Sequence, residues 1–139
     1  MSYKIISRFI KDISFEVPNV QTVLMLEKEI SKYNLKFDIK SKPFKDNIIE
    51  VSTILSVTPF QEVQNKMLTE INYTALVSIE KNFEDKKELE KIILIKVPQE
   101  IYPALYEIFV YLYTQAGVKD IRIDKEVNFE KLYSEQYKS

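Results

Sequence analysis

The stretch from Ile101 to Tyr113 carries a single charged side chain, Glu107. Its apolar residues recur at helical spacing, so the stretch is predicted to form a helix. A helix on a protein surface normally keeps one polar face, and this stretch lacks one. A sheet can cover only one side of such a helix. The rest of its surface must therefore meet another helix of the chain, a second subunit or a bound client.

A membrane span is a poor explanation for this stretch, because a spanning helix needs about 20 apolar residues and this run is shorter and rich in tyrosine. Burial within one chain remains an open alternative. A chain of 139 residues has few other elements to supply the cover, however, so we favour a subunit interface. The residues expected at that interface are Leu105, Ile108, Phe109 and Leu112.

The first half of the chain alternates apolar and polar residues, which is typical of β-strands. Turn-forming residues separate the runs, as at Pro43 and the pair Asp46–Asn47. In the first run the alternation leaves apolar residues on both faces, so we expect this strand to be covered on two sides. The four runs cover residues 3–10, 35–40, 49–57 and 71–80.

The second half carries the signals of helices. Asp85, with a glutamate three residues later, has the spacing of a capping box at a helix start. Pro98 is expected to restart the helical run, and Gly117 stands where a left-handed cap would end the next helix. Asn128 is expected to cap a last short helix. Strands followed by helices predict one α+β domain over residues 1–139.

Composition excludes several classes of chemistry. The chain contains no cysteine, no histidine and a single glycine. Structural zinc sites, thiol nucleophiles and imidazole bases need the first two, and glycine-rich phosphate loops need several of the third. We therefore expect no enzyme, no catalytic residue, no metal and no cofactor. With 20 basic and 21 acidic residues, no basic excess indicates nucleic acid as a partner.

The amino-terminal residues give an expectation about localisation. They lack the long apolar core and the small-residue cleavage site of a secretory signal peptide. The absence of cysteine fits a reducing compartment. We therefore expect a cytoplasmic protein without membrane insertion.

Three blocks of residues stand out together. They are Lys11–Glu16 with Pro18–Asn19, then Pro98, Tyr102, Pro103, Glu107 and Gly117, and finally Ile121, Ile123, Asp124, Val127–Phe129, Leu132 and Tyr133. In this order and spacing they resemble the SecB family of protein-export chaperones. The run Leu35–Ile39 fits the family pattern as well, so the resemblance spans most of the chain.

The resemblance implies a four-stranded antiparallel sheet with two or three helices packed on one face, assembled as a dimer of dimers. Such chaperones hold unfolded precursor proteins without ATP and deliver them to the SecA export motor. Asp12 and Glu16 stand at the positions that the family uses to dock SecA. The residues that match the family's apolar client groove are Leu35, Phe37, Ile39, Phe129, Leu132, Tyr133 and Tyr137.

Some features depart from the family pattern. SecB proteins are usually strongly acidic, whereas this chain has a net charge of -1. Residues 81–85 replace the family's glycine-containing turn. Two alternatives to a general export chaperone stay open, namely a SecB-like chaperone dedicated to one partner such as an antitoxin, and a structural oligomerisation module. Residues 21–33 are also open, because their spacing fits a helix while the resemblance implies an extended crossing segment.

Overall fold

A computed structural model describes residues 3–29, 33–59, 66–80, 85–118 and 126–136. The strands are β1 (Tyr3–Glu16), β2 (Tyr33–Lys45), β3 (Ile48–Pro59) and β4 (Leu68–Ile79). The helices are α1 (Val20–Glu29), α2 (Lys86–Lys91), α3 (Val97–Gln115) and α4 (Phe129–Gln136), with a π-helical turn over Ile92–Lys96 between α2 and α3.

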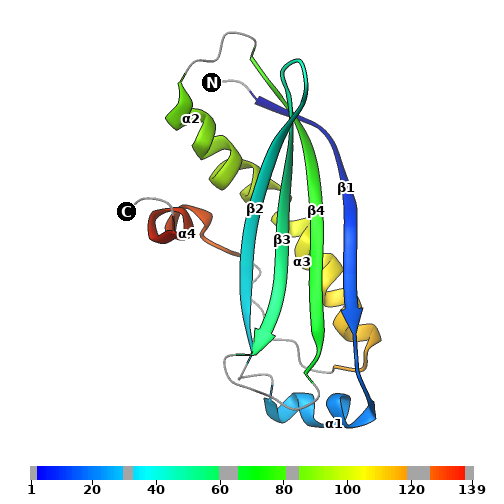
Figure 1. Ribbon diagram of the computed structural model, residues 1–139. Coiled ribbons are helices and arrows are strands. Elements are labelled where there is room, and N and C mark those ends of the chain that lie inside the picture. Colours follow the sequence, from blue (N-terminus) through cyan, green and yellow to red (C-terminus); the bar gives the residue numbers. More distant parts are fainter. Residues whose placement is uncertain (1–2, 30–32, 60–65, 81–84, 119–125, 137–139) are drawn as a thin grey trace.

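The strands form one antiparallel sheet in the order β1-β4-β3-β2, so β1 and β2 are its edges. Helix α3 runs behind the sheet in Figure 1, α4 lies beside β2, and α1 lies below the lower ends of the strands. We call the sheet face that packs against α3 the inner face and the opposite face the outer face. This arrangement confirms the predicted α+β fold, a four-stranded antiparallel sheet with helices.

The core lies between the inner face and α3. Alternate residues of β3 and β4 supply one side, as shown by Leu55 and Ile71, which pair across the sheet and are fully buried. Leu105 and Phe109 of α3 belong to the same buried cluster. The opposite side of α3 is exposed, and Tyr111 there keeps 64% of its surface accessible. The sheet thus covers one side of this apolar helix, as expected.

Strand β1 does not keep the strict alternation that its sequence suggests. Its register against β4 shifts between Ile5 and Ser7 and again between Ile10 and Asp12, which indicates two β-bulges. At each bulge the residues that face one side of the sheet therefore switch between odd-numbered and even-numbered positions. The expectation that this strand is covered on two sides is wrong for the single chain, because Ile6 and Ile10 remain 46% and 49% exposed.

The segment left open by the sequence folds as helix α1 rather than as an extended crossing. Its start is capped by Asn19, whose side-chain oxygen accepts a hydrogen bond from the Thr22 backbone N–H at 3.1 Å. The helix reaches the end of α3, where Gly117 has a φ of +92°. A Cβ at position 117 would lie 3.7 Å from the Val23 side chain. The predicted left-handed cap at Gly117 is confirmed.

Other caps also form where the sequence places them. The Asp85 side chain accepts a hydrogen bond from the Glu88 N–H at 3.1 Å, and that of Asn128 accepts one from the Lys131 N–H at 3.0 Å. Pro98 does not break the helical run, however. The π-helical turn before it, in which the Val97 N–H bonds to the Ile92 carbonyl, joins α2 to α3 and leaves Pro98 in a first turn, where proline is tolerated. Among the described helices, none has the length and apolarity to cross a membrane.

A buried hydroxyl pair joins the end of α3 to the sheet and predicts a loss of stability at high pH. The Tyr113 hydroxyl lies 2.6 Å from the Thr69 hydroxyl, and burial raises the pKa of Tyr113 to about 12. An unfolded tyrosine titrates near 10. The neutral form is favoured by folding, so this contribution is complete below pH 10 and disappears as pH rises towards 12. Two pKa units correspond to about 3 kcal/mol at most.

The measurement is the urea midpoint of wild type and Tyr113→Phe between pH 8 and pH 12. We expect the variant to be less stable by about 1 kcal/mol at pH 8, because Thr69 loses its partner. The difference should shrink or reverse as pH rises, since the other tyrosines titrate in both proteins. If the urea midpoints of the two proteins changed in parallel from pH 8 to pH 12, Tyr113 would not contribute to the loss of stability at high pH.

Candidate functional site

The predicted groove residues lie along the β2 edge of the sheet and on α4. Leu35, Phe37 and Ile39 point to the inner face and are half-buried. On α4, Leu132 is half-buried, whereas Phe129 and Tyr133 keep only 0% and 8% of their surface accessible. The structure therefore brings six of the seven predicted groove residues to one side of the molecule. The seventh, Tyr137, lies outside the described residues.

Three aromatic rings connect α4 to β2 and α3. The Phe37 ring lies 5.3 Å from Phe129 and 5.7 Å from Tyr102, and Phe129 lies 6.0 Å from Tyr102, all in edge-to-face geometry. Such pairs contribute about 0.5–1.5 kcal/mol each beyond the area they bury. The Phe129 N–H also donates a hydrogen bond to the Gln99 side chain at 3.5 Å. These contacts place the start of α4 over the edge of the sheet.

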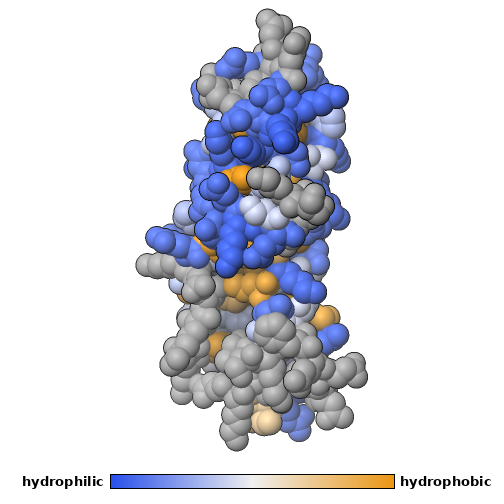
Figure 2. Space-filling model, turned by 90° about the vertical axis from the view of Figure 1, so that its left-hand side faces the viewer, coloured by the Kyte–Doolittle hydropathy of each residue, from blue (hydrophilic) through white to orange (hydrophobic). Residues whose placement is uncertain are grey.

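Figure 2 views the molecule from the side that carries α4 and the β2 edge. Apolar surface gathers near the middle of this view, below an upper half that is mostly hydrophilic. The half-buried apolar residues of β2, of α4 and of the segment before α4 that pack against the core are Leu35, Phe37, Ile39, Val127 and Leu132. Large apolar surfaces that are only partly covered are typical of binding sites for other polypeptides.

Two of the predicted groove residues, Phe129 and Tyr133, are buried, which restricts the access of a client to them. In the described conformation the chain itself occupies the space around Phe129 and Tyr133. An incoming polypeptide could reach the β2 residues directly, but it could reach these two rings only after α4 moved. Helix α4 has only eight residues, and isolated helices of that length are marginal in water. Its position therefore depends on the contacts that it makes with β2 and α3.

The predicted interface residues on α3 divide into two pairs. Leu105 and Phe109 are 0% and 3% exposed and belong to the core of the single chain. Ile108 and Leu112 are half-buried and flank the exposed side of the helix. Tyr111 lies on that exposed side and was not predicted. Its spacing of four residues from Glu107, another exposed residue, is the sequence signal that could have identified it.

The predicted docking acids lie on the outer face. Asp12 pairs with Asn72 and Glu16 with Leu68, so both acids stand beside β4, and both are exposed. Between those two pairs, Ser14 stands opposite Glu70, which is exposed as well. Glu70 is therefore a third carboxylate beside the predicted pair. Sequence reasoning missed it because it depends on the pairing of two distant strands.

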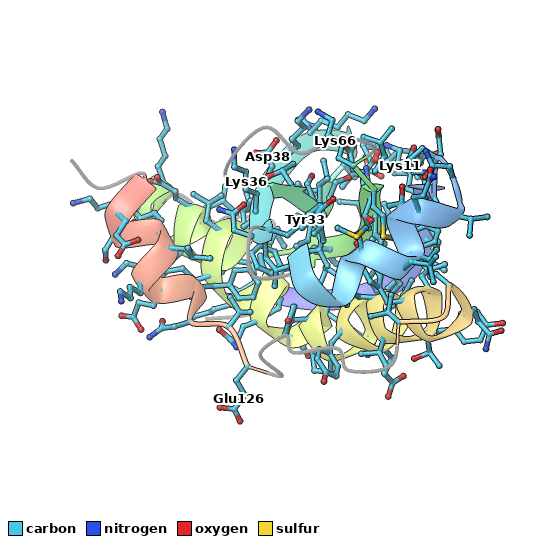
Figure 3. The ribbon with its side chains drawn as sticks, turned by 90° about the horizontal axis from the view of Figure 1, so that it is seen from below. Lys11, Tyr33, Lys36, Asp38, Lys66 and Glu126 are labelled. Atoms are coloured by element: carbon cyan, nitrogen blue, oxygen red, sulfur yellow. The ribbon has the colours of Figure 1, made fainter. Side chains whose placement is uncertain are left out.

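The other end of the outer face is rich in lysine. Glu50 of β3 forms ion pairs there with Lys11 of β1 and, at 3.9 Å, with Lys42 of β2. The hydrogen bond from Lys11 is the main reason that the pKa of Glu50 is lowered. In Figure 3, seen from below, Lys11 and Asp38 lie above the sheet and α3 lies beneath it.

The exposed edge of β1 is the largest uncovered apolar feature of the sheet. Ile6, Phe9, Ile10 and Ile13 are each exposed by 37–49%. An open hollow of about 570 Å³ is lined by residues 3–8 of this strand and by Glu100 of α3. Glu100 accepts a hydrogen bond from the Tyr3 hydroxyl there at 3.1 Å. An exposed edge strand that carries apolar side chains is a surface at which a further strand can pair.

Comparison with known proteins gives consistent results. The family model described as preprotein translocase subunit SecB matches residues 1–139. A protein-export protein SecB of Pelagibacter ubique is 45% identical over 135 residues, which cover 97% of this chain and 96% of the relative. A protein-export protein SecB of Acidovorax sp. is 29% identical over 128 residues, which cover 92% of this chain and 83% of the relative.

A solved structure shares the fold. It is a SecB-like chaperone of Mycobacterium tuberculosis in complex with a peptide from an antitoxin. The TM-score is 0.68, the sequences are 13% identical, and the match covers 90% of this chain and 88% of the other.

Proposed function

Because the chain belongs to the SecB family of preprotein translocase subunits, we propose that it is a cytoplasmic, non-enzymatic chaperone that holds unfolded precursor proteins for export. The observation that carries this proposal is the row of half-buried apolar residues on β2, with Phe37 at its centre, beside the short helix α4. Such a row offers contact area to any apolar segment. Binding to this row does not require that the client have a particular folded shape.

Binding in this proposal needs no chemical step. An unfolded segment contacts Leu35, Phe37 and Ile39 and competes with α4 for the space around Phe129. A chaperone that binds only the unfolded state draws protein towards that state according to its affinity and concentration. Neither nucleotide nor metal takes part. Release then depends on a competing partner.

That competing partner is a SecA-type motor, and Asp12 and Glu16 are its proposed docking residues. Both side chains are exposed and lie on the face of the sheet opposite to the groove residues. Glu70, between them in the register, extends the acidic surface. A motor docked there would leave the groove free, so one chaperone could hold a client and contact the motor together.

Assembly as a homotetramer, a dimer of dimers, is part of the same proposal. The β1 edge supplies one surface, because a second copy of β1 would cover its exposed apolar side chains and pair its free backbone groups. The exposed side of α3, with Ile108, Tyr111 and Leu112, supplies the other. Leu105 and Phe109, the other two residues predicted at the interface, are buried in the core of the single chain.

Lysine in place of Ile6 and Ile10 should therefore reduce the size of the assembly. A lysine on an edge strand opposes pairing with another strand. The same double change on α1, Val20→Lys with Leu24→Lys, is the matched control, because those residues are also exposed, by 74% and 71%. Light scattering should show a tetramer for wild type and control and a smaller species for the β1 variant. A monomeric wild type at micromolar concentration would contradict the proposal.

A second candidate is a SecB-like chaperone that serves a single partner. Its support is the near-neutral charge of the chain, unlike the acidic export chaperones, together with the antitoxin peptide bound to the Mycobacterium tuberculosis chaperone. The two candidates differ in how many clients they accept. The test is suppression of aggregation for several unrelated, denaturant-unfolded proteins without nucleotide. General holding predicts suppression of all of them, whereas suppression of none would favour the single-partner chaperone, and a requirement for ATP would contradict both.

A further inference from the structure

The outer face divides into two halves of opposite charge. Its lower half, beside the lower ends of the strands in Figure 1, is acidic, and its upper half is rich in lysine. On the described strands, the acidic half contains Asp12, Glu16, Asp38 and Glu70 together with Lys36, and the lysine half contains Lys4, Lys11, Lys40 and Lys42 together with Glu50. The register of the strands places these residues on this face, except for Lys11, which lies in a bulge of β1 and reaches the face through its ion pair with Glu50. Lys66, just before β4, also lies on the outer side at the acidic end (Figure 3), where the described carboxylates still outnumber the lysines.

The lysine half retains an excess of positive charge after its internal pairing. Glu50 is shared by Lys11 and Lys42, whose side chains remain 41% and 68% exposed. Lys4 and Lys40 are exposed as well. Along β4 the centre of the lysine half is near Leu76 and that of the acidic half is near Glu70. Six strand residues separate these centres, which corresponds to about 20 Å.

This layout restricts what can bind. A nucleic acid or an anionic membrane extends well beyond 20 Å, so it would meet the carboxylates of the acidic half as soon as it covered the lysine half. A wholly basic partner would meet the lysines in the same way. A segment with an acidic cluster and a basic cluster at matching spacing satisfies both halves together.

We propose that the outer face docks a polypeptide segment that is acidic at one end and basic at the other. The segment lies along the strands, with its basic end on the acidic half and its acidic end on the lysine half. This inference rests on the docking role proposed above for the outer face. It adds the lysine half as a second contact and defines the charge pattern of the partner.

Exposed ion pairs contribute little singly, because water screens them and long side chains lose entropy. A docking segment therefore needs several pairs at once, and the arrangement of charge determines which partner is accepted. The interaction should weaken as ionic strength rises, since both halves are solvent-exposed.

The test uses two fluorescent peptides of identical composition. One has a glutamate block and a lysine block whose centres are about six extended residues apart, which corresponds to about 20 Å. The other has the same residues with glutamate and lysine alternating. At low salt the block peptide should bind the whole protein about tenfold more tightly than the alternating peptide. Equal affinities would overturn the inference. An all-glutamate peptide or a single-stranded RNA that binds as tightly as the block peptide would also overturn it.

Two variants locate the contact. Lys40→Glu with Lys42→Glu should weaken binding of the block peptide about tenfold, while Lys86→Glu with Lys87→Glu, the same change on exposed residues of α2, should leave it unchanged. Equal losses of peptide affinity in the two double variants would overturn the inference. Aggregation suppression is measured on the same proteins. Because Lys40 and Lys42 face away from the groove residues, holding should stay at the wild-type level, and lost peptide binding with intact holding would leave the proposed function in place.

Discussion

Alanine in place of both Phe37 and Tyr133 should weaken the binding of unfolded clients by at least about tenfold. Phe37 lies at the centre of the half-buried row on β2, and Tyr133 belongs to helix α4, which lies beside that row. Loss of two aromatic rings removes much of the contact area available to an apolar segment. Binding is measured by fluorescence anisotropy of a labelled, permanently unfolded client at a temperature where the variant remains folded.

The same variant will also be less stable, so it needs a control of similar stability. Phe37 contacts Phe129 and Tyr102, and truncation of a well-packed aromatic residue costs about 3–5 kcal/mol. Leu105→Ala removes a fully buried core residue at a comparable cost, about 2–5 kcal/mol, and does not belong to the groove residues. Client affinity should fall for the double variant and stay unchanged for the control. Equal losses in the two proteins would show that stability, rather than the groove, determines binding.

Reversal of the charge at the two docking residues, by Asp12→Lys with Glu16→Lys, should weaken binding to a SecA-type motor on the order of a hundredfold at low salt. Both acids are exposed on the outer face, and lysine there converts attraction to a basic partner surface into repulsion. The effect should shrink as salt rises, because exposed charges are screened within about 10 Å at 0.1 M ionic strength. Client holding should not change.

A matched control separates the docking site from total charge. Glu126→Lys with Glu130→Lys makes the same change of charge on exposed residues at and just before the start of α4. The measurement is motor affinity across a salt series for wild type and both variants. If the two variants lose affinity equally, overall charge drives the association. If neither loses affinity, export docking at Asp12 and Glu16 is rejected and the single-partner candidate gains support.

Local signals explain what the sequence predicted well. Caps at Asp85, Asn128 and Gly117 depend on neighbouring residues only, and all three form. The alternating runs of β2, β3 and β4 likewise form strands, although the centre of the sheet is buried on both faces, as at Ser52 and Thr74. Helix α1 was left open because its spacing and the family resemblance indicated different structures. The structure agrees with the spacing.

The features that escaped prediction depend on distant parts of the chain. Two bulges in β1 arise where it pairs with β4, and no local residue pattern marks them. The direction of Leu105 and Phe109 depends on which side of α3 meets the sheet, which an almost uniformly apolar helix does not reveal. Glu70 joins Asp12 and Glu16 only through strand register. The division of the outer face into two charged halves has the same origin.

The central claim is that unfolded clients bind the inner-facing residues of β2, and neighbouring positions of that strand test it most directly. Ile39 is one of the groove residues and faces inwards, whereas Lys40 faces outwards. A photo-reactive phenylalanine analogue is placed at one position or the other, and the whole protein is irradiated with an unfolded client and no nucleotide. We predict strong cross-linking from position 39 and little from position 40. Equal cross-linking from both positions, or more from position 40, would contradict the account.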